Sequence, residues 1–402
     1  MATITNTILS NRVLNMEESA TLRMAQLARD IAAQGHDVIS LSLGEPDFDT
    51  PDHIKEAAMQ ALRDGYTKYT PVPGLMELRK AVSKKFKEEN NLDYGTDQIV
   101  VSNGAKQTIA NICMALLNEG DEVVILGPYW VSYSAIVKVA GGVPVVISAG
   151  IEDDYKVSPE QLEAAISDKT KFVLFSSPCN PTGSVFTEEE LTTFANIIAK
   201  RENVFVVADE IYEYINFTAK HFSIGSLPQI KDRAITVNGF SKGFAMTGWR
   251  LGYMGAPVKI AKACAKIQGQ NTSGANAFGQ MAGAYALEAD KGPTREMRAA
   301  YLKRRDLVIS LLNEIPGLKT NNPQGAFYIF PDCSDYFGKS DGETTINNAN
   351  DFCEYIMNNA YVAVVTGTAF GADNCFRISY AASEEQLTEA LKRIKTALAK
   401  LG

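Results

Sequence analysis

The sequence predicts an α/β fold in which a large domain holds a mostly parallel, doubly wound sheet and a smaller α/β domain accompanies it. Two observations support this prediction. Short apolar runs alternate with amphipathic helical patterns through the middle of the chain, an order typical of parallel sheets. Runs such as 204–208 are apolar at every position, as strands covered by helices on both faces must be.

The length and composition set the broad class of protein. The chain has 402 residues, 46% of them apolar and 21% charged, which is typical of a globular protein too large for a single small core. We expect residues 50–295 to form the large domain. Residues 1–49 and 296–402 are expected to form the small one.

Several kinds of protein are disfavoured by the same inventory. The net charge is −8 and no dense run of Lys and Arg occurs, so a nucleic-acid surface is not expected. No stretch of eighteen apolar residues and no signal-peptide pattern occurs, so no membrane association is expected and the cytoplasm is the default location. Six scattered cysteines and three histidines, without a C-x-x-C pair, predict no metal site.

The individual elements follow from the apolar patterns. Strands are expected at 99–102, 122–126, 143–147, 171–176, 204–208, 234–237 and 374–380, and helices at 105–117, 188–200 and 298–312. Thr187 with Glu190 forms a capping box before the second of these helices. Ser383 with Gln386 does the same for a final helix, whose apolar face carries Leu387, Leu391, Ile394, Leu398 and Leu401.

Polar residues follow four of the expected strands. Asn103-Gly104 comes after the first, Asn180 follows 171–176 in a proline-rich loop, Asp209 follows 204–208, and Lys242 follows 234–237. Taken singly, these residues could be ordinary turn, helix-cap or surface residues. Ligands of open α/β sheets bind beyond the carboxyl ends of the strands, so four such endings in one sheet indicate a site there.

Lys242 is the most informative of these residues. It stands in a tight loop, directly after Gly239-Phe-Ser241 and eight residues before Arg250. A lysine held away from bulk water has a lowered pKa and can act as a nucleophile or base. Lysines of this kind form covalent bonds to pyridoxal phosphate.

The chain resembles a known family through an ordered series of motifs. They are Leu43–Pro51 (LGEPDFDTP), Lys68–Gly74 (KYTPVPG), Asn103–Gln107 (NGAKQ), Gly127–Tyr133 (GPYWVSY), Ser177–Gly183 (SPCNPTG), Asp209–Tyr212 (DEIY), Ser241–Arg250 (SKGFAMTGWR) and Phe376–Ser379 (FRIS). In this order the series resembles the class I, fold-type I pyridoxal phosphate-dependent aminotransferases. More narrowly, it is similar to the bacterial aspartate aminotransferase subgroup that includes the aspartate/prephenate enzymes.

The resemblance implies roles toward the ring of the cofactor. Lys242 would carry pyridoxal 5′-phosphate covalently and later move the substrate's Cα proton. Asp209 would pair with the pyridine nitrogen and keep it protonated, so that the ring withdraws electrons. Asn180 and Tyr212 would donate hydrogen bonds to the phenolate oxygen. Trp130 would stack on the ring, although a core or interface position is the commoner role of a tryptophan.

The resemblance also implies how the phosphate is held. Ser241, Arg250 and the backbone amides of Gly104 and Ala105 would bind it. Tyr69 would reach the phosphate bound in a neighbouring subunit, so that the active unit would be a homodimer with shared sites. The simpler alternative for Tyr69 is a loop tyrosine packed on prolines.

The substrate's α-carboxylate would be bound by Arg377, aided by the backbone of Gly44, with Asn180 and Trp130 also bordering the substrate. The simpler alternative for Arg377 is a surface ion pair. Phe376 and Ile378 flank it in a strand-like run, which favours the buried, functional reading.

The distal substrate carboxylate would be bound by Lys106, with Ser19 and Thr21 closing over it. Lys106 could instead be a helix lysine facing water. Glu17-Glu18 stand where relatives often carry a lysine, which leaves a prephenate activity open.

The function expected from this resemblance is a ping-pong transfer of the amino group from L-aspartate to 2-oxoglutarate, so the partners would be amino acids and 2-oxo acids. Alternatives are a prephenate or aromatic aminotransferase, or a carbon–sulfur β-lyase on the same scaffold. A non-enzymatic pyridoxal phosphate sensor is a remote alternative, because the first motif begins near Leu43 and leaves little room for a preceding DNA-binding domain.

Overall fold

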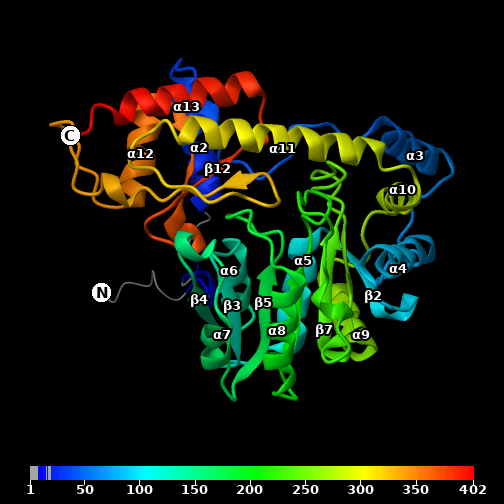
Figure 1. Ribbon diagram of the computed structural model, residues 1–402. Coiled ribbons are helices and arrows are strands. Elements are labelled where there is room, and N and C mark those ends of the chain that lie inside the picture. Colours follow the sequence, from blue (N-terminus) through cyan, green and yellow to red (C-terminus); the bar gives the residue numbers. More distant parts are fainter. Residues whose placement is uncertain (1–7, 15, 17–19) are drawn as a thin grey trace.

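The computed structural model describes residues 8–14, 16 and 20–402 and shows two lobes (Figure 1). The lower lobe in this view is built on a seven-stranded sheet. The strands, in their spatial order, are β2 (Ile99–Ser102), β8 (Gly252–Gly255), β7 (Ala234–Gly239), β6 (Phe205–Asp209), β5 (Thr170–Ser176), β3 (Glu122–Gly127) and β4 (Val143–Ser148).

Six of the seven strands run in the same direction. The neighbours β7, β6, β5, β3 and β4 pair in parallel, whereas β8 is antiparallel to both β7 and β2. Because β8 alone is reversed, β2 shares the direction of the others. The carboxyl ends of β2, β5, β6 and β7 therefore lie along one edge of the sheet.

Helices cover both faces of this sheet. The helices of this lobe are α3 (Asp52–Arg63), α4 (Met76–Asn90), α5 (Ala105–Leu116), α6 (Ser132–Val139), α7 (Pro159–Ala165), α8 (Glu188–Ala199), α9 (Val258–Asn271) and α10 (Ala277–Glu288), of which α3 packs on α10. Val123 of β3 packs in a cluster with side chains of α5, α6 and α9, whereas the adjacent Val124 packs with α7 and α8. Successive strand residues point to opposite faces, which explains why these strands are apolar throughout.

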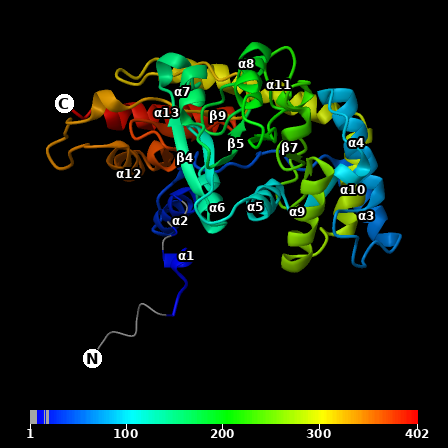
Figure 2. The same ribbon diagram turned by 90° about the horizontal axis from the view of Figure 1, so that it is seen from below.

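The second lobe combines the N-terminal and C-terminal parts of the chain. β1 (Ile39–Ser40) pairs in parallel with β10 (Val362–Ala363), and β12 (Phe376–Ser379) lies between β11 (Val365–Thr366) and β9 (Tyr328–Ile329). The helices are α2 (Ala20–Ala33), α12 (Ala349–Ala360) and α13 (Glu384–Leu398), while the short α1 (Asn11–Leu14) projects beyond α2 (Figure 2). One buried apolar cluster joins Ile39 and Leu41 to residues 297–401.

The long helix α11 (Gly292–Leu312) runs across the top of both lobes in Figure 1. Its first residue follows the end of α10 after a short connection, and its other end packs on α13. Its buried side chains Tyr301, Val308 and Leu312 belong to the core of the second lobe. The sequence predicts a helix at 298–312, and the observed helix begins six residues earlier.

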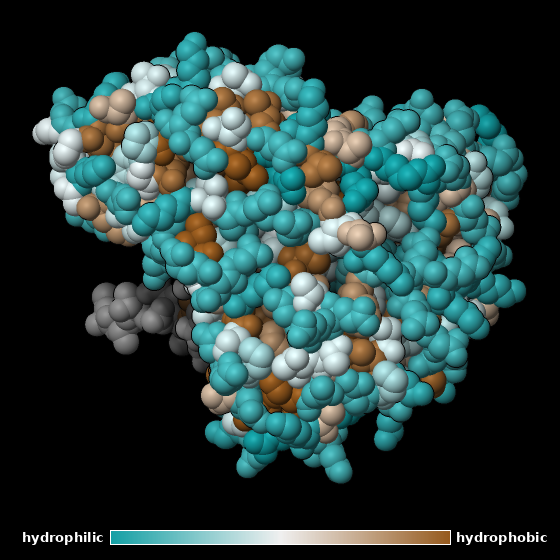
Figure 3. Space-filling view, viewed as in Figure 1, coloured by the Kyte–Doolittle hydropathy of each residue, from teal (hydrophilic) through white to brown (hydrophobic). Residues whose placement is uncertain are grey.

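The predicted fold class is confirmed, since the sheet is mostly parallel and helices cover both of its faces. The two predicted capping boxes are present at Thr187 and Ser383. The division at residues 49/50 and 295/296 stays a prediction. On the face shown in Figure 3, hydrophilic residues predominate and apolar residues form separate patches. Among the described helices, none is both long and apolar enough to span a bilayer.

Candidate active site

The polar residues predicted at the strand ends meet at one edge of the sheet. Asp209 ends β6 and lies in register with Ser176 of β5 and Val237 of β7. Asn180 lies in the loop that follows β5, and Lys242 follows β7. Strands β5, β6 and β7 are adjacent and parallel, so their carboxyl ends lie side by side at this edge of the sheet.

Lys242 is partly buried, and its ammonium donates a hydrogen bond to the carbonyl of Gly44. Nζ also lies 5.7 Å from the ring centroids of both Tyr212 and Phe327. Burial, reinforced by the positive charge of Arg377, lowers the pKa of Lys242 to about 8. A substantial fraction of this lysine is therefore neutral at physiological pH and able to accept a proton or attack a carbonyl.

Asp209 is buried, with 3% of its surface exposed. Tyr133 Oη donates to its Oδ2 at 2.8 Å, and the backbone N–H of Ile211 donates to its Oδ1 at 3.2 Å. Burial raises the pKa of Asp209 to about 6, although both hydrogen bonds oppose the shift. Among the described residues it has no ion-pair partner, so this carboxylate is suited to a cation or a protonated ring nitrogen brought by a ligand.

Arg377, in the middle of β12, is 2% exposed. Its Nη1 donates to Asn180 Oδ1 at 3.0 Å, and its Nη2 donates to the carbonyl of Ser42 at 2.6 Å. The guanidinium lies 4.4 Å from the ring centroid of Tyr328. Its Nε is buried without a hydrogen-bond partner, which leaves one donor for an anionic ligand. The surface ion pair considered from the sequence is thus replaced by a buried, pre-oriented cation.

Tyr212 and Tyr328 share a hydrogen bond between their hydroxyls, with the oxygens 2.8 Å apart. Both side chains are buried, and burial raises the pKa of each phenol. They therefore stay protonated at physiological pH and can donate hydrogen bonds. A side chain at Gly44 would collide with the Tyr328 hydroxyl, so glycine is required there for close approach.

Another part of the site, here called the cradle, is the space next to the first turn of α5. Gly104 precedes the helix with a φ of +86°, and Ala105 is its first residue. The guanidinium of Arg250 lies over Gly104, donating to the carbonyl of Thr247 at 2.9 Å. Ser241 is buried in the turn next to Lys242. A helix N-terminus beside an arginine attracts anions such as phosphate, and a side chain at position 104 would fill the space.

Lys106 lies in the first turn of α5, and its side chain is exposed at the surface but covered in part by its neighbours. Its Nζ is 5.0 Å from the ring centroid of Trp130, which itself packs edge-on against Tyr133. Partial burial of the ammonium and the charge of Arg250 lower the pKa of Lys106. Trp130 thus connects the lysine to the Asp209 side of the site.

Thr21 and Tyr69 take part in none of the contacts described above. Thr21 is half-buried on α2, while Ser19 lies outside the described residues. Tyr69 is 99% exposed, so the chain by itself does not bring it to the site.

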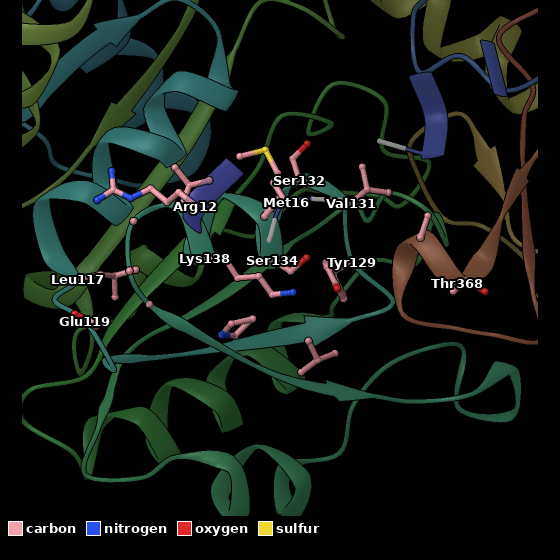
Figure 4. A pocket seen from close by; sticks show the side chains of 18 of the residues that line it. Arg12, Met16, Leu117, Glu119, Tyr129, Val131, Ser132, Ser134, Lys138 and Thr368 are labelled. Carbon is pink, nitrogen blue, oxygen red and sulfur yellow. The ribbon is translucent and has the colours of Figure 1, made fainter. Parts of the chain in front are cut away.

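A hollow of about 1810 Å³ lies between the N-terminal segment, α6 and the loop after β11 (Figure 4), next to the segment that carries Trp130. Arg12 and Arg23 line it from the N-terminal segment, Lys138 from α6 and Thr368 from the second lobe. Tyr129, next to Trp130, also contributes to its wall. Residues of both lobes therefore face each other across this hollow, which lies close to Trp130.

Three contributors to the site were not assigned roles from the sequence. Tyr328 supports both Arg377 and Tyr212, Tyr133 binds Asp209, and Glu45 accepts a hydrogen bond from Thr247. Tyr133 and Glu45 stand inside recognised motifs, which is a signal that could have found them. Tyr328 lies in an apolar run whose sequence gives no such signal.

Comparisons with known proteins agree on one family. The profile described as "Aminotransferase class I and II" matches residues 36–394. A bifunctional aspartate aminotransferase and glutamate/aspartate-prephenate aminotransferase from Petunia hybrida is 47% identical over 395 residues, covering 97% of this chain and 82% of that protein. A probable aspartate/prephenate aminotransferase from Rhizobium leguminosarum bv. phaseoli is 45% identical over 390 residues, covering 96% and 98% of the two chains.

Solved structures give the same result. The crystal structure of the aspartate aminotransferase from Rhizobium meliloti superposes with a TM-score of 0.95 at 41% identity, covering 98% of this chain and 99% of that one. The Thermus thermophilus aspartate aminotransferase with maleate superposes with a TM-score of 0.91 at 41% identity, covering 97% and 99%.

Proposed function

Because this chain belongs to the class I and II aminotransferases, we propose that it transfers the amino group of L-aspartate to 2-oxoglutarate, giving oxaloacetate and L-glutamate. Enzymes of this family use pyridoxal phosphate. When bound, that cofactor supplies an aldehyde for the amino group and a ring that withdraws electrons from the substrate's Cα.

The residues of the site fit this cofactor. Lys242 offers a half-buried amine whose pKa is lowered to about 8 by burial, Asp209 a buried carboxylate without an ion-pair partner among the described residues, and Gly104 an open cradle at a helix N-terminus. We propose that these three hold the aldehyde carbon, the ring nitrogen and the phosphate. Arg250 and Ser241 would assist at the phosphate, and Tyr212 and Asn180 at the phenolate oxygen.

The single observation that carries the proposal is that the Lys242 amine lies against the rings of Tyr212 and Phe327, within reach of the charges of Asp209 and Arg377. Both charged groups shift its pKa, and burial shifts it most. Arg377 would bind the α-carboxylate and so orient the substrate's Cα–H bond toward Lys242. In its neutral form, the Lys242 amine would accept the Cα proton. The burial of Arg377 and the ring beneath it exclude water from this end of the site.

The choice of a dicarboxylic substrate is supported by Lys106. Its ammonium, which lies next to Trp130, is a cation that can bind a carboxylate in addition to the one bound by Arg377. Relatives with aspartate in their names, and the Thermus enzyme solved with the dicarboxylate maleate, favour the same choice. We propose that Lys106 binds the distal carboxylate, with Thr21 and Ser19 closing over it, and that closure narrows the hollow beside Trp130.

Prephenate is a second candidate substrate, because several relatives are named aspartate/prephenate aminotransferases. Prephenate also carries a carboxylate away from its 2-oxo acid group, so the same lysine would serve. Phenylalanine lacks that carboxylate and is expected to react more slowly.

We further propose a homodimer that works in the cytoplasm. The near-complete exposure of Tyr69, 99%, supports its insertion into a partner subunit's phosphate site. The exposure of Arg250 leaves that phosphate site open to such a partner. All six cysteines are buried and unpaired, which supports a reducing compartment.

The decisive experiment is a panel of half-reactions on the purified, cofactor-loaded enzyme. Conversion of the cofactor's absorbance to that of its amine form is measured with aspartate, glutamate, alanine and phenylalanine, and the reverse conversion with 2-oxoglutarate and prephenate. Aspartate and glutamate are expected to react fastest. Faster conversion by alanine or phenylalanine would contradict a dicarboxylate site. In a separate incubation with cystathionine and no oxo acid, release of pyruvate would indicate a β-lyase instead.

A further inference from the structure

A second group of polar side chains lies on the other side of the turn that carries Asp209 and Tyr212. We call it the charge cluster, and it consists of Lys85, Asn90, Glu210, Glu213, His221 and Ser223. All of these residues are buried except His221, whose side chain is 10% exposed. None of them is used by the proposed reaction.

The members of the charge cluster are linked in a continuous network. Lys85 forms an ion pair with Glu213 and donates to Asn90 Oδ1 at 2.6 Å. Asn90 Nδ2 donates to Glu213 Oε2 at 2.8 Å and to Ser223 Oγ at 3.0 Å. The Ser223 hydroxyl donates to Glu210 Oε2 at 2.7 Å.

His221 completes the balance of charge. Its Nε2 lies 3.0 Å from Glu210 Oε2. Two carboxylates and one ammonium leave a net charge of −1, which a protonated His221 brings to zero. Burial alone would lower the pKa of His221, but Glu210 and Glu213 outweigh it and the pKa is raised. Glu210, Glu213 and His221 are near enough together to bind a metal ion, but Lys85 already supplies a cation to Glu213.

The turn presents residues 209 and 212 to one side and residues 210 and 213 to the other. Asp209 and Tyr212 face Lys242, whereas Glu210 and Glu213 enter the charge cluster. The turn is short and hydrogen-bonded, since Glu210 N donates to the Val237 carbonyl and Glu213 N donates to the Glu210 carbonyl, both at 2.9 Å. A displacement of either glutamate would therefore move the residues on the side of the cofactor.

The charge cluster also closes a loop that contacts the second lobe. Glu213 stands at the start of this loop and His221 at its end. Between them, Phe217 N donates to the Gln324 carbonyl and Ala326 N donates to the Ile215 carbonyl, both at 2.7 Å. The contacted segment continues into Tyr328, the residue that binds Tyr212.

From this geometry we propose that the charge cluster is a positioning device for the cofactor. It fixes Asp209 and Tyr212 from behind and holds the adjoining loop against the segment that leads to Tyr328. Its residues touch neither substrate nor cofactor and act through the turn. The inference rests on the proposed placement of the cofactor at Asp209 and Tyr212.

The test uses Glu213→Gln, Lys85→Met and the double variant, with the exposed pair Lys200 and Glu163, 2.7 Å apart, as matched control. The dissociation constant of pyridoxal phosphate and the pH titration of the bound cofactor's absorbance are measured for each. Each single variant leaves one buried charge unpaired, so cofactor affinity is expected to fall about tenfold or more, with a shifted titration. The double variant removes both charges and is expected to recover part of the loss. Lys200→Met and Glu163→Gln should match the wild type.

A lower melting temperature with unchanged cofactor affinity and unchanged titration would reduce the charge cluster to a structural role and overturn the proposal. If Glu213→Gln does not fold, His221→Gln gives the same two measurements with a milder change. Asp209→Asn, measured in parallel, separates the two possible failures. Unchanged affinity in that variant would remove the cofactor from Asp209 and overturn the proposed site, whereas a loss there without effect in the charge-cluster variants would overturn only the positioning role.

Discussion

The two ends of the proposed substrate site are built differently. Arg377 is 2% exposed and donates to Asn180 and to the Ser42 carbonyl. Lys106 is exposed at the surface and has the face of Trp130 as its neighbour. The end that would bind the group common to all amino acids is fixed in advance, while the end that would select aspartate is open.

The difference follows from where each residue stands. Arg377 lies in the middle of a strand with buried neighbours on both sides, so its fork is oriented before any ligand arrives. Lys106 is an exposed residue in the first turn of α5, and its flexible stem leaves the ammonium free to move. A preorganised end contributes rate, and a mobile end that must be ordered contributes selectivity at the cost of some affinity.

The largest effect is expected from removing Lys242, because the reaction needs this lysine whichever end of the site binds the substrate. Lys242→Ala should lower turnover about 10⁴-fold or more, because general base catalysis and covalent attachment are lost together. Steady-state rates with aspartate and circular dichroism measure activity and fold. Lys262→Ala on the exposed face of α9 serves as the control. Substantial turnover in a well-folded Lys242→Ala protein would refute the assigned role.

The next largest effect concerns the preorganised end. Arg377→Lys should lower kcat/KM by about 10²–10³-fold, and equally for aspartate and alanine, because a lysine cannot reproduce the planar fork or the stacking on Tyr328. Parallel kinetics with both amino acids give the measurement. A loss confined to aspartate would place Arg377 at the distal carboxylate and reverse the comparison.

A third prediction measures the stability cost of preorganisation in the cofactor-free protein. The pKa of Asp209 is raised by burial from 3.8 to about 6, so its carboxylate destabilises the folded state above pH 6 and not below pH 4. Asp209→Asn should therefore stabilise the cofactor-free fold at pH 7.5 by up to about 3 kcal/mol. The gain should shrink toward pH 5.

Urea unfolding at the two pH values measures this difference in the free energy of unfolding. Asn can still accept the hydrogen bond from Tyr133, which limits other changes. A stability gain that does not depend on pH would mean that the Asp209 carboxylate is not the cause.

The smallest effect concerns the open end. Lys106→Ala should lower kcat/KM for aspartate about ten- to a hundredfold, the value of one charge-assisted contact, and leave alanine nearly unchanged. Lys259→Ala, an exposed lysine in the first turn of α9, is the matched control. Equal losses on both amino acids would remove Lys106 from the distal site.

Much of the fold and part of the site could be predicted from the chain alone. The strand predicted at 99–102 has its observed bounds, and each of the other predicted strands agrees with the structure to within two residues at either end. Apolar runs and capping residues act over a few positions, so their signal is complete in the local sequence. The strand-end residues could be identified for the same reason, because the residue that follows a parallel strand lies at the ligand edge wherever the strand is placed.

The packing of distant segments decided the rest. Arg377 could be named from its motif, but its burial depends on Asn180 and Ser42, which are 197 and 335 positions away. Tyr328 became a support for Tyr212 across 116 positions, and Lys85 became the cation of Glu213 only when α4 packed beneath the turn. Local propensity fixes which residues form an element, whereas the pKa of a buried group and the partner of a buried charge depend on which elements meet, and this is determined only in the folded chain.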